Sequence, residues 1–139
     1  MKTFGEKEKD YIYIKREAVY GLVRVDKKFL TIYSNKRLYL PGGGIECGES
    51  QLDCLKREFL EETGYDIKID GYFTSAKLYD YIKNLDKYFE MIGYFYIVSL
   101  KNNCRNADQN IQSVFIDEDN LGDFLLLPHH AWAIQSYLK

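Results

Sequence analysis

The stretch that decides the fold is Gly42–Gly64, which reads GGGIECGESQLDCLKREFLEETG. It opens with three consecutive glycines and closes with three glutamates, Glu58, Glu61 and Glu62, at the spacing i, i+3 and i+4. On an α-helix this spacing places the three carboxylates along one edge, where each pair of like charges costs roughly 0.2–0.5 kcal/mol. The segment therefore predicts a helix whose acidic edge needs a positively charged partner.

The predicted helix has defined ends and one apolar face. Ser50 is a favourable N-cap, with Asp53 three residues later as in a capping box, and Gly64 suits the left-handed position after a helix. With Glu58 at 0° on a helical wheel, the apolar stripe falls between about 60° and 120°, and the glutamates between about 300° and 40°. We predict as core-facing residues Leu52, Leu55 and Phe59. The acids therefore flank the predicted core instead of lying opposite it.

Neighbouring cations are too few to balance these acids. Arg57 can pair with some of them but cannot neutralise all three, whereas Mg²⁺ or Mn²⁺ would, because hard divalent cations take carboxylate oxygens as ligands. The glycine run fits such a site, because its backbone N–H groups can approach phosphate oxygens closely. Taken singly, acids on a helix are usually a solvated face, and a PGGG sequence is usually only a turn. Their combination predicts a site for phosphate and metal.

The composition indicates one intracellular domain. The chain has 139 residues, of which 46% are hydrophobic, enough to bury roughly two-thirds of its unfolded surface. A formal charge of −2 gives no electrostatic reason to expect nucleic acid or an anionic membrane as a partner. The first ten residues are charged, and the longest apolar run, 91–100, is too short to span a bilayer. Three cysteines without a CxxC pair fit reduced thiols in a cytoplasm better than a zinc or disulfide framework.

Strands are predicted on both sides of the central helix. Two of them, Ala18–Val25 and Lys28–Tyr33, should meet at a tight turn near Asp26-Lys27. Further strands are expected at Leu38–Leu40, Asp66–Leu78, Lys87–Leu100 and Ser113–Ile116, with a loop at 102–110. A short helix is expected over Asn120–Leu125 and a terminal helix over Ala131–Leu138, with Ala131, Ile134 and Leu138 on one face. This order indicates an α+β domain with a mixed sheet flanked by helices.

The glycine-to-glutamate segment resembles the Nudix box, G-x5-E-x7-R-E-U-x-E-E-x-G-U, in which U is a bulky apolar residue. Its positions are taken, in order, by Gly43, Glu49, Arg57, Glu58, Phe59, Glu61, Glu62, Gly64 and Tyr65. The only mild departure is Tyr65, where an aliphatic residue is commoner. The box covers 43–65, and its flanks are similar to small MutT-like members of the family. The resemblance implies a single Nudix domain over 1–139, an α/β/α sandwich with a mixed β-sheet between helices.

The resemblance also implies roles for the residues of the box. Glu61 and Glu62 would bind Mg²⁺ or Mn²⁺, Glu58 would be a further ligand or the base that orients the water, and the Gly42 carbonyl would complete the coordination. Arg57 would pair with Glu49 and hold the loop against the helix. The remaining implied roles are substrate-phosphate binding by Gly42, Gly43 and Gly44, an outer acid at Glu46, and a structural role for Gly64.

Candidates outside the box are weaker. Family members often recruit one more acid, and this chain offers Glu90, Asp108, Asp117 and Glu118, with Asp108 slightly favoured by its loop. A tyrosine past the box marks diadenosine polyphosphate enzymes, and here Tyr79 or Tyr81 would fill that place. The pair His129-His130 is predicted to pack or cap the last helix, because adjacent side chains point in different directions. Of the thiols, Cys54 is expected in the core and Cys47 at the surface.

The implied activity is Mg²⁺-dependent hydrolysis of a nucleoside diphosphate linked to another group. Normal or oxidised nucleoside triphosphates are the default substrate, with a nucleoside monophosphate and pyrophosphate as products. The ADP-ribose branch carries a proline past the box, whereas this chain has only Pro41 and Pro128. The alternatives are hydrolysis of dinucleoside polyphosphates and a noncatalytic nucleotide sensor. Many members form homodimers, and the sequence does not decide the oligomeric state.

Overall fold

The computed structural model describes residues 1–123 and 126–139. Its strands are β1 (Lys2–Phe4), β2 (Tyr13–Leu22), β3 (Arg24–Val25), β4 (Lys28–Ser34), β5 (Arg37–Tyr39), β6 (Gly42–Gly44), β7 (Tyr65–Ile82), β8 (Lys87–Asn103) and β9 (Gln112–Asp117). Its helices are α1 (Gln51–Thr63), a 3₁₀ helix (Glu118–Asp123) and α2 (Pro128–Leu138). No helix in the described part of the chain is both long enough and apolar enough to cross a membrane.

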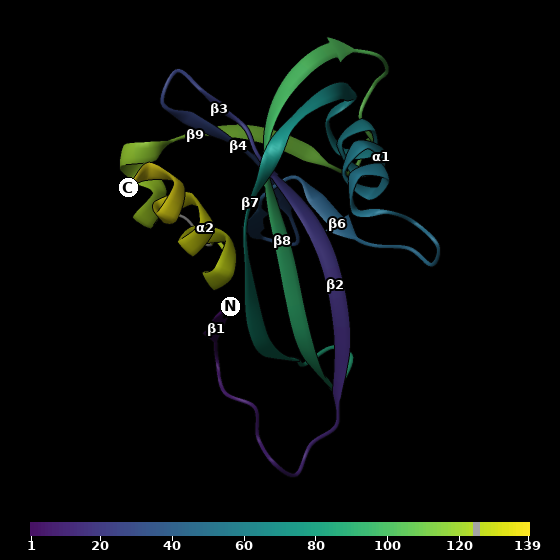
Figure 1. Ribbon diagram of the computed structural model, residues 1–139, viewed down its shortest axis with the longest axis vertical. Helices are drawn as coiled ribbons and strands as arrows, with labels where there is room; N and C mark the ends of the chain where they lie inside the picture. Colours follow the sequence, from purple (N-terminus) through teal and green to yellow (C-terminus); the bar gives the residue numbers. More distant parts are fainter. Residues whose placement is uncertain (124–125) are drawn as a thin grey trace.

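The strands form one large mixed sheet and one small antiparallel sheet. The large sheet has the order β1-β7-β8-β2-β6, with β1 parallel to β7, β8 parallel to β2, and the other pairs antiparallel. In the small sheet β4 pairs with β3, β5 and β9. Figure 1 shows α1 and α2 on opposite sides of the large sheet. This is the α/β/α sandwich with a mixed sheet that the sequence predicted.

Alternation along β2 explains why both faces of the large sheet are buried. Val19 points to the side of α1 and packs in a cluster with Leu55, Phe59 and residues of β7 and β8. Leu22 lies in a second cluster with Phe95 of β8 and Ile134 of α2. Successive side chains of a strand point to opposite faces, so one strand contributes to both clusters.

Helix α1 begins and ends where the sequence indicated. The hydroxyl of Ser50 accepts a hydrogen bond from the Asp53 N–H at 3.1 Å, and Gly64 follows the helix with φ of 78°. Leu55 and Phe59 are fully buried, as expected. The prediction for Leu52 was wrong, because it is 44% exposed. Leu52 is the second residue of the helix, and Cys54, two residues later, is buried instead.

Several other expectations need correction. The N-terminal segment was not predicted to pair, yet β1 adds a parallel edge strand beside β7. The glycine run is not only a turn, since Gly42–Gly44 forms β6 against β2. Strands β7 and β8 extend past their predicted ends, because each satisfies the backbone groups of the other. The predicted short helix is a 3₁₀ helix that starts at Glu118, and residues 124–125 of that prediction lie outside the described part.

The terminal helix starts three residues earlier than predicted and turns a different face to the core. Pro128 occupies its first turn, a position that needs no N–H donor. Ile134 is buried as expected, but Leu138 is 39% exposed and Ala133 is buried instead. The two-residue turn after β3 is confirmed, with positive φ values at both Asp26 and Lys27.

Candidate active site

Strand β6 brings the glycines against the acids of α1. The N–H of Gly42 donates a hydrogen bond to Glu62 Oε1 at 2.8 Å. Gly42 has φ of 143°, and a Cβ there would overlap the carbonyl oxygen of Val19 in β2. A Cβ on Gly43 would lie 2.5 Å from Glu58 Oε1. Both glycines are therefore needed for the backbone to approach the carboxylates this closely.

Arg57 contacts several of the carboxylates at the acidic edge of α1. Its Nε and Nη2 atoms donate to the two carboxylate oxygens of Glu49 at 2.7 and 3.0 Å, which is the pair that the family resemblance implied. Its Nη1 atom donates to Glu58 at 3.0 Å and to Glu61 at 3.3 Å, and lies 3.7 Å from the exposed Glu46. One guanidinium is therefore shared by four carboxylates, which leaves the acidic edge with an excess of negative charge.

The environments of the carboxylates differ in a way that separates their pKa values. The Arg57 hydrogen bond lowers the pKa of Glu49 to about 2. Burial raises the pKa of Glu62 to about 8, and the nearby charges of Glu58 and Glu61 act in the same direction. Burial is also the main reason that the pKa of Glu58 is raised. Glu58 and Glu62 are thus the acids that would gain most from a bound cation.

The chemistry of these residues suits a hard divalent cation, but their side chains do not form a preassembled metal site. Carboxylate oxygens are the ligands that Mg²⁺ and Mn²⁺ prefer, and the three glutamates of α1 lie beside a glycine strand. Within residues 1–123 and 126–139, no three His, Cys, Asp or Glu side chains converge closely enough to hold an ion. The reason is visible in the contacts, because Arg57 Nη1 lies between Glu58 and Glu61. Metal binding would require these side chains to rotate.

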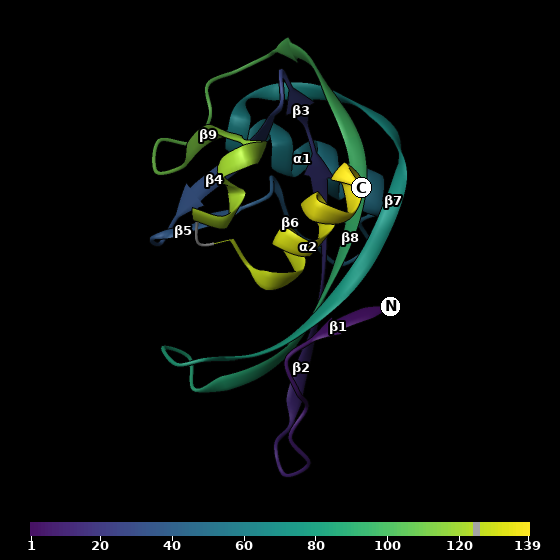
Figure 2. The ribbon, with the colours of Figure 1, turned by 90° about the vertical axis from the view of Figure 1, so that its left-hand side faces the viewer.

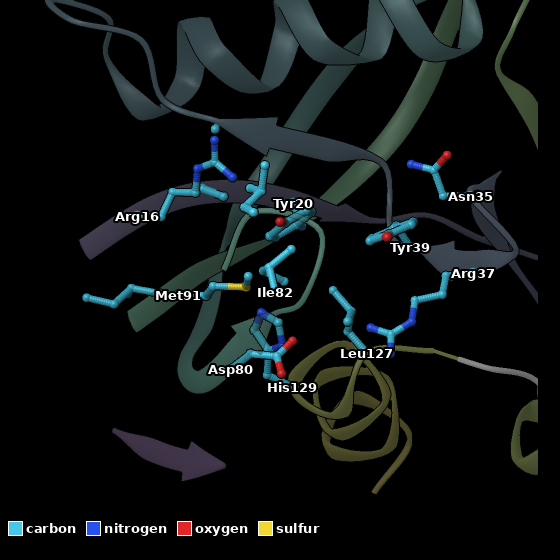
Figure 3. A pocket seen from close by; sticks show the side chains of 14 residues that line it. Arg16, Tyr20, Asn35, Arg37, Tyr39, Asp80, Ile82, Met91, Leu127 and His129 are labelled. Atoms are coloured by element: carbon cyan, nitrogen blue, oxygen red, sulfur yellow. The ribbon is translucent and has the colours of Figure 1, made fainter. Parts of the chain in front are cut away.

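Two adjoining cavities lie beside this edge. The smaller, about 230 Å³, is lined by Gly42 and Glu62 together with Tyr20, Asn35 and Tyr39. The larger, about 530 Å³, shares those last three residues and continues toward Arg16, Arg37, Asp80, His129 and the end of the β7–β8 hairpin (Figure 3). Figure 2 shows the hairpin end curving beneath β5 and α2, and Asp80, Ile82 and Leu85 from this end line the larger cavity.

The aromatic residues that line these cavities were not predicted from the sequence. Arg16, Ala18 and Tyr20 alternate along β2 and all face the larger cavity, and this period of two was visible in the sequence. The proposed marker tyrosines lie elsewhere, since neither lines a described cavity. The Tyr79 hydroxyl bonds to Glu90, and the Tyr81 hydroxyl bonds to Asp86. Tyr20 and Tyr39 are the tyrosines that line both cavities.

None of the four acids suggested outside the box has its carboxylate at this edge. Glu90 pairs with Lys77, Glu118 pairs with Arg24, and Asp117 accepts a hydrogen bond from the Asp119 N–H. Asp108 comes nearest through its backbone, because its N–H donates to the carbonyl oxygen of Glu61 at 2.9 Å. Its side chain points to Arg105, 3.4 Å away. The loop that carries Asp108 therefore contacts α1 without adding an acid.

The histidine pair packs the start of α2, as predicted. His129 and His130 are both fully buried. His130 Nδ1 accepts a hydrogen bond from the Leu40 N–H at 3.1 Å, whereas His129 Nδ1 and His130 Nε2 have no partner among the described residues. Burial lowers the pKa of His129 to about 4, so its ring is neutral near pH 7. The thiols also follow expectation, with Cys54 buried and Cys47 exposed.

Comparisons with known proteins agree with this architecture. A family model described as the NUDIX domain matches residues 14–138. A MutT protein from Methanosarcina mazei Go1 superimposes with a TM-score of 0.70 at 19% identity, over 90% of this chain and 94% of that one. A NUDIX hydrolase from Nitrosomonas europaea gives 0.68 at 19% identity, over 90% and 89% of the two chains. A UDP-X diphosphatase gives 0.65 at 16% identity, over 94% and 67%.

No curated protein sequence matches the chain. At sequence identities below 20%, the similarity to these solved structures supports the fold alone. The family model carries the assignment, because it spans most of the chain and includes the acidic helix and its glycine strand. The chain belongs to the NUDIX domain family and is a hydrolase of phosphoric anhydride bonds.

Proposed function

We propose that the chain is a Mg²⁺-dependent pyrophosphohydrolase of nucleoside triphosphates, normal or oxidised. The observation that carries this proposal is the contact between the glycine strand and the acids, where Gly42 bonds to Glu62 and Gly43 lies against Glu58. A phosphate chain bound along β6 would meet the carboxylates of α1 directly. The adjoining aromatic cavity would take the nucleoside, because Tyr20 and Tyr39 offer ring surfaces for a base.

Some residues of the site would bind the cation, and others hold the loop in place. Glu61 and Glu62 would hold the cation, with Glu58 as a further ligand or as the base that orients the attacking water, and the Gly42 carbonyl would complete the coordination. When bound, Mg²⁺ would neutralise phosphate charge, lower the pKa of a bound water and stabilise the leaving oxygen. Arg57 holds Glu49 and the loop in place and would release Glu58 and Glu61 as the cation binds.

The proposed reaction is hydrolysis of one phosphoric anhydride bond. The water oxygen forms a bond to phosphorus, the bridging P–O bond breaks, and the released pyrophosphate takes the bond electrons. Glu58 is suited to accept the proton of the water, because burial raises its pKa and so makes its carboxylate a stronger base. Dinucleoside polyphosphates are a weaker candidate, since Tyr79 and Tyr81 lie away from the described cavities.

Glu61→Gln tests the metal-binding edge. This substitution keeps the shape of the side chain but removes a charge, so we expect loss of Mg²⁺-dependent phosphate release with an unchanged circular dichroism spectrum. Asp53→Asn is the matched control, because it removes an exposed acid from the first turn of the same helix. The panel should include triphosphates, diadenosine polyphosphates, ADP-ribose and nucleotide sugars. A folded Glu61→Gln protein with wild-type turnover would overturn the assignment.

A further inference from the structure

The residues that lead into the glycine strand are held by three different elements of the fold. The N–H of Leu40 donates a hydrogen bond to His130 Nδ1 of α2 at 3.1 Å. The carbonyl oxygen of Pro41 accepts a hydrogen bond from the Gly21 N–H of β2 at 2.8 Å, and the Gly42 N–H donates to a glutamate of α1 at 2.8 Å. Three consecutive residues are thus each bonded to a different element, and the last of them begins β6.

The bond to His130 connects the acidic edge to a helix that lies outside the glycine-to-glutamate segment. Leu40 follows β5 and precedes β6 without belonging to either strand, and its N–H bonds to the histidine ring instead of to a neighbouring strand. Helices α1 and α2 lie on opposite sides of the large sheet (Figure 1). The start of the glycine strand is therefore held from both sides of that sheet.

The same histidine ring packs against a wall of the cavities. His130 is 0% exposed, and the centroid of its ring lies 4.2 Å from that of Tyr20. Tyr20 is opposite Gly42 in the register of β2 and β6, and it lines both cavities. One buried side chain therefore supports both the backbone that leads into the glycines and the aromatic wall beside them.

Packing alone does not explain a histidine at this position. Because Nδ1 accepts the Leu40 N–H, the neutral ring carries its proton on Nε2. That atom is buried and has no partner among the described residues, so the ring satisfies one buried polar group and leaves another unpaired. Burial holds the pKa of His130 well below its usual range, which keeps Nδ1 free to accept. The net gain in stability from the histidine is therefore small, whereas its hydrogen bond fixes the position of the Leu40 backbone.

We propose that His130 is a positioning residue for the hydrolysis, which sets the place of Gly42 beside the acids of α1 through the Leu40 N–H. This inference rests on the proposed function, because the Gly42 carbonyl is assigned to the cation there. Leu40 and Gly42 are separated only by Pro41, whose ring restricts the backbone between them. A shift at Leu40 is therefore passed on to Gly42. His130 itself would touch neither the cation nor the substrate.

Two substitutions separate the hydrogen bond from the packing. His130→Phe keeps a ring and removes the acceptor, whereas His130→Asn loses the ring and keeps an acceptor, because its Oδ1 is bonded to Cγ as Nδ1 is in histidine. At saturating Mg²⁺ we expect kcat to fall about tenfold in His130→Phe and to stay within about threefold of the wild type in His130→Asn. KM should change by less than about threefold in both, since His130 does not touch the substrate.

Ile134→Val is the matched control for lost packing. Ile134 is fully buried one turn further along α2, and the substitution removes one methyl group from the core without changing a hydrogen bond. This variant should lose stability in urea and keep the kcat of the wild type. A purely structural role of His130 would instead make the loss of kcat follow the loss of stability across the three variants.

A second measurement does not depend on turnover. The affinity for Mn²⁺ in the absence of nucleotide can be followed by the electron paramagnetic resonance signal of the free ion. We expect it to fall about tenfold in His130→Phe, the effect typical of losing a group that orients a metal ligand. It should stay close to that of the wild type in His130→Asn and Ile134→Val.

The inference is overturned if His130→Phe keeps both the kcat and the Mn²⁺ affinity of the wild type. It is also overturned if Ile134→Val or His130→Asn loses as much as His130→Phe. The proposed function fails separately. If the wild type binds Mn²⁺ but hydrolyses no triphosphate, the proposed reaction is wrong, and the difference in Mn²⁺ affinity between His130→Phe and His130→Asn still decides the role of His130.

Discussion

Gly43→Ala should disable the hydrolase without unfolding it. The added Cβ would lie 2.5 Å from Glu58 Oε1 and 2.6 Å from its carboxyl carbon. Ordinary contact begins near 3.4 Å, so the carboxylate must move by about 0.9 Å. A displacement of about 1 Å at a reacting group costs on the order of 100-fold in rate. Because Gly43 is not among the residues with positive φ, alanine fits the backbone, and we expect a change in stability below about 1 kcal/mol.

The assay is steady-state phosphate release with saturating Mg²⁺, together with urea unfolding of each variant. Gly44→Ala is the comparison, because the same methyl group placed one residue later meets no atom within 4 Å. It should cost several-fold at most. Gly71→Ala adds a methyl group in open space on β7 and controls for the substitution itself. If Gly43→Ala keeps a third or more of the wild-type turnover, or if Gly44→Ala loses as much, the close approach does not govern catalysis.

Three other predictions concern stability and the outlying tyrosines. Gly64→Ala should lower the free energy of unfolding, measured with urea, by about 2 kcal/mol. The reason is that Gly64 has φ of 78° and a Cβ there would overlap the Arg105 carbonyl oxygen. A loss below roughly 0.5 kcal/mol, the size of a typical surface substitution, would contradict this. His129 has a folded pKa of about 4, below its usual 6.5. Its contribution to the free energy of unfolding is therefore fully present above pH 6.5 and is lost as the pH falls toward 4. Between pH 7 and 5 the free energy of unfolding should fall by about 2 kcal/mol more in the wild type than in His129→Phe. This comparison cancels the effect of carboxylates that titrate in both proteins. Parallel plots of unfolding free energy against pH for the two proteins would rule out this role of His129. Tyr79→Phe and Tyr81→Phe should leave the turnover of triphosphates and of diadenosine polyphosphates within twofold of the wild type, and a selective loss on the dinucleotides would restore the alternative substrate.

The central helix could be read from the sequence because its signals are local. Ser50 and Gly64 set its ends through contacts within one turn, and Leu55 and Phe59 follow from helical periodicity. The prediction for Leu52 failed because a wheel gives the direction of a side chain but not the extent of the surface that covers it. The same limit applies to α2, where Leu138 was expected in the core and Ala133 occupies it.

The sequence by itself determined the family, the acidic helix and the Arg57–Glu49 pair, because each depends on residues within one short segment. Only the tertiary structure decided which residues line the cavities beside the acids. Tyr20 comes from β2, Tyr39 from β5 and His129 from α2, and these residues meet because β2 lies inside the large sheet while β5 and α2 close over one end of it. Such contacts join positions up to about a hundred residues apart, and no local periodicity encodes which strand lies beside which. The position of the acidic edge on α1 was therefore fixed by local sequence, whereas the shape and charge of the cavities beside it were fixed by the packing of distant elements.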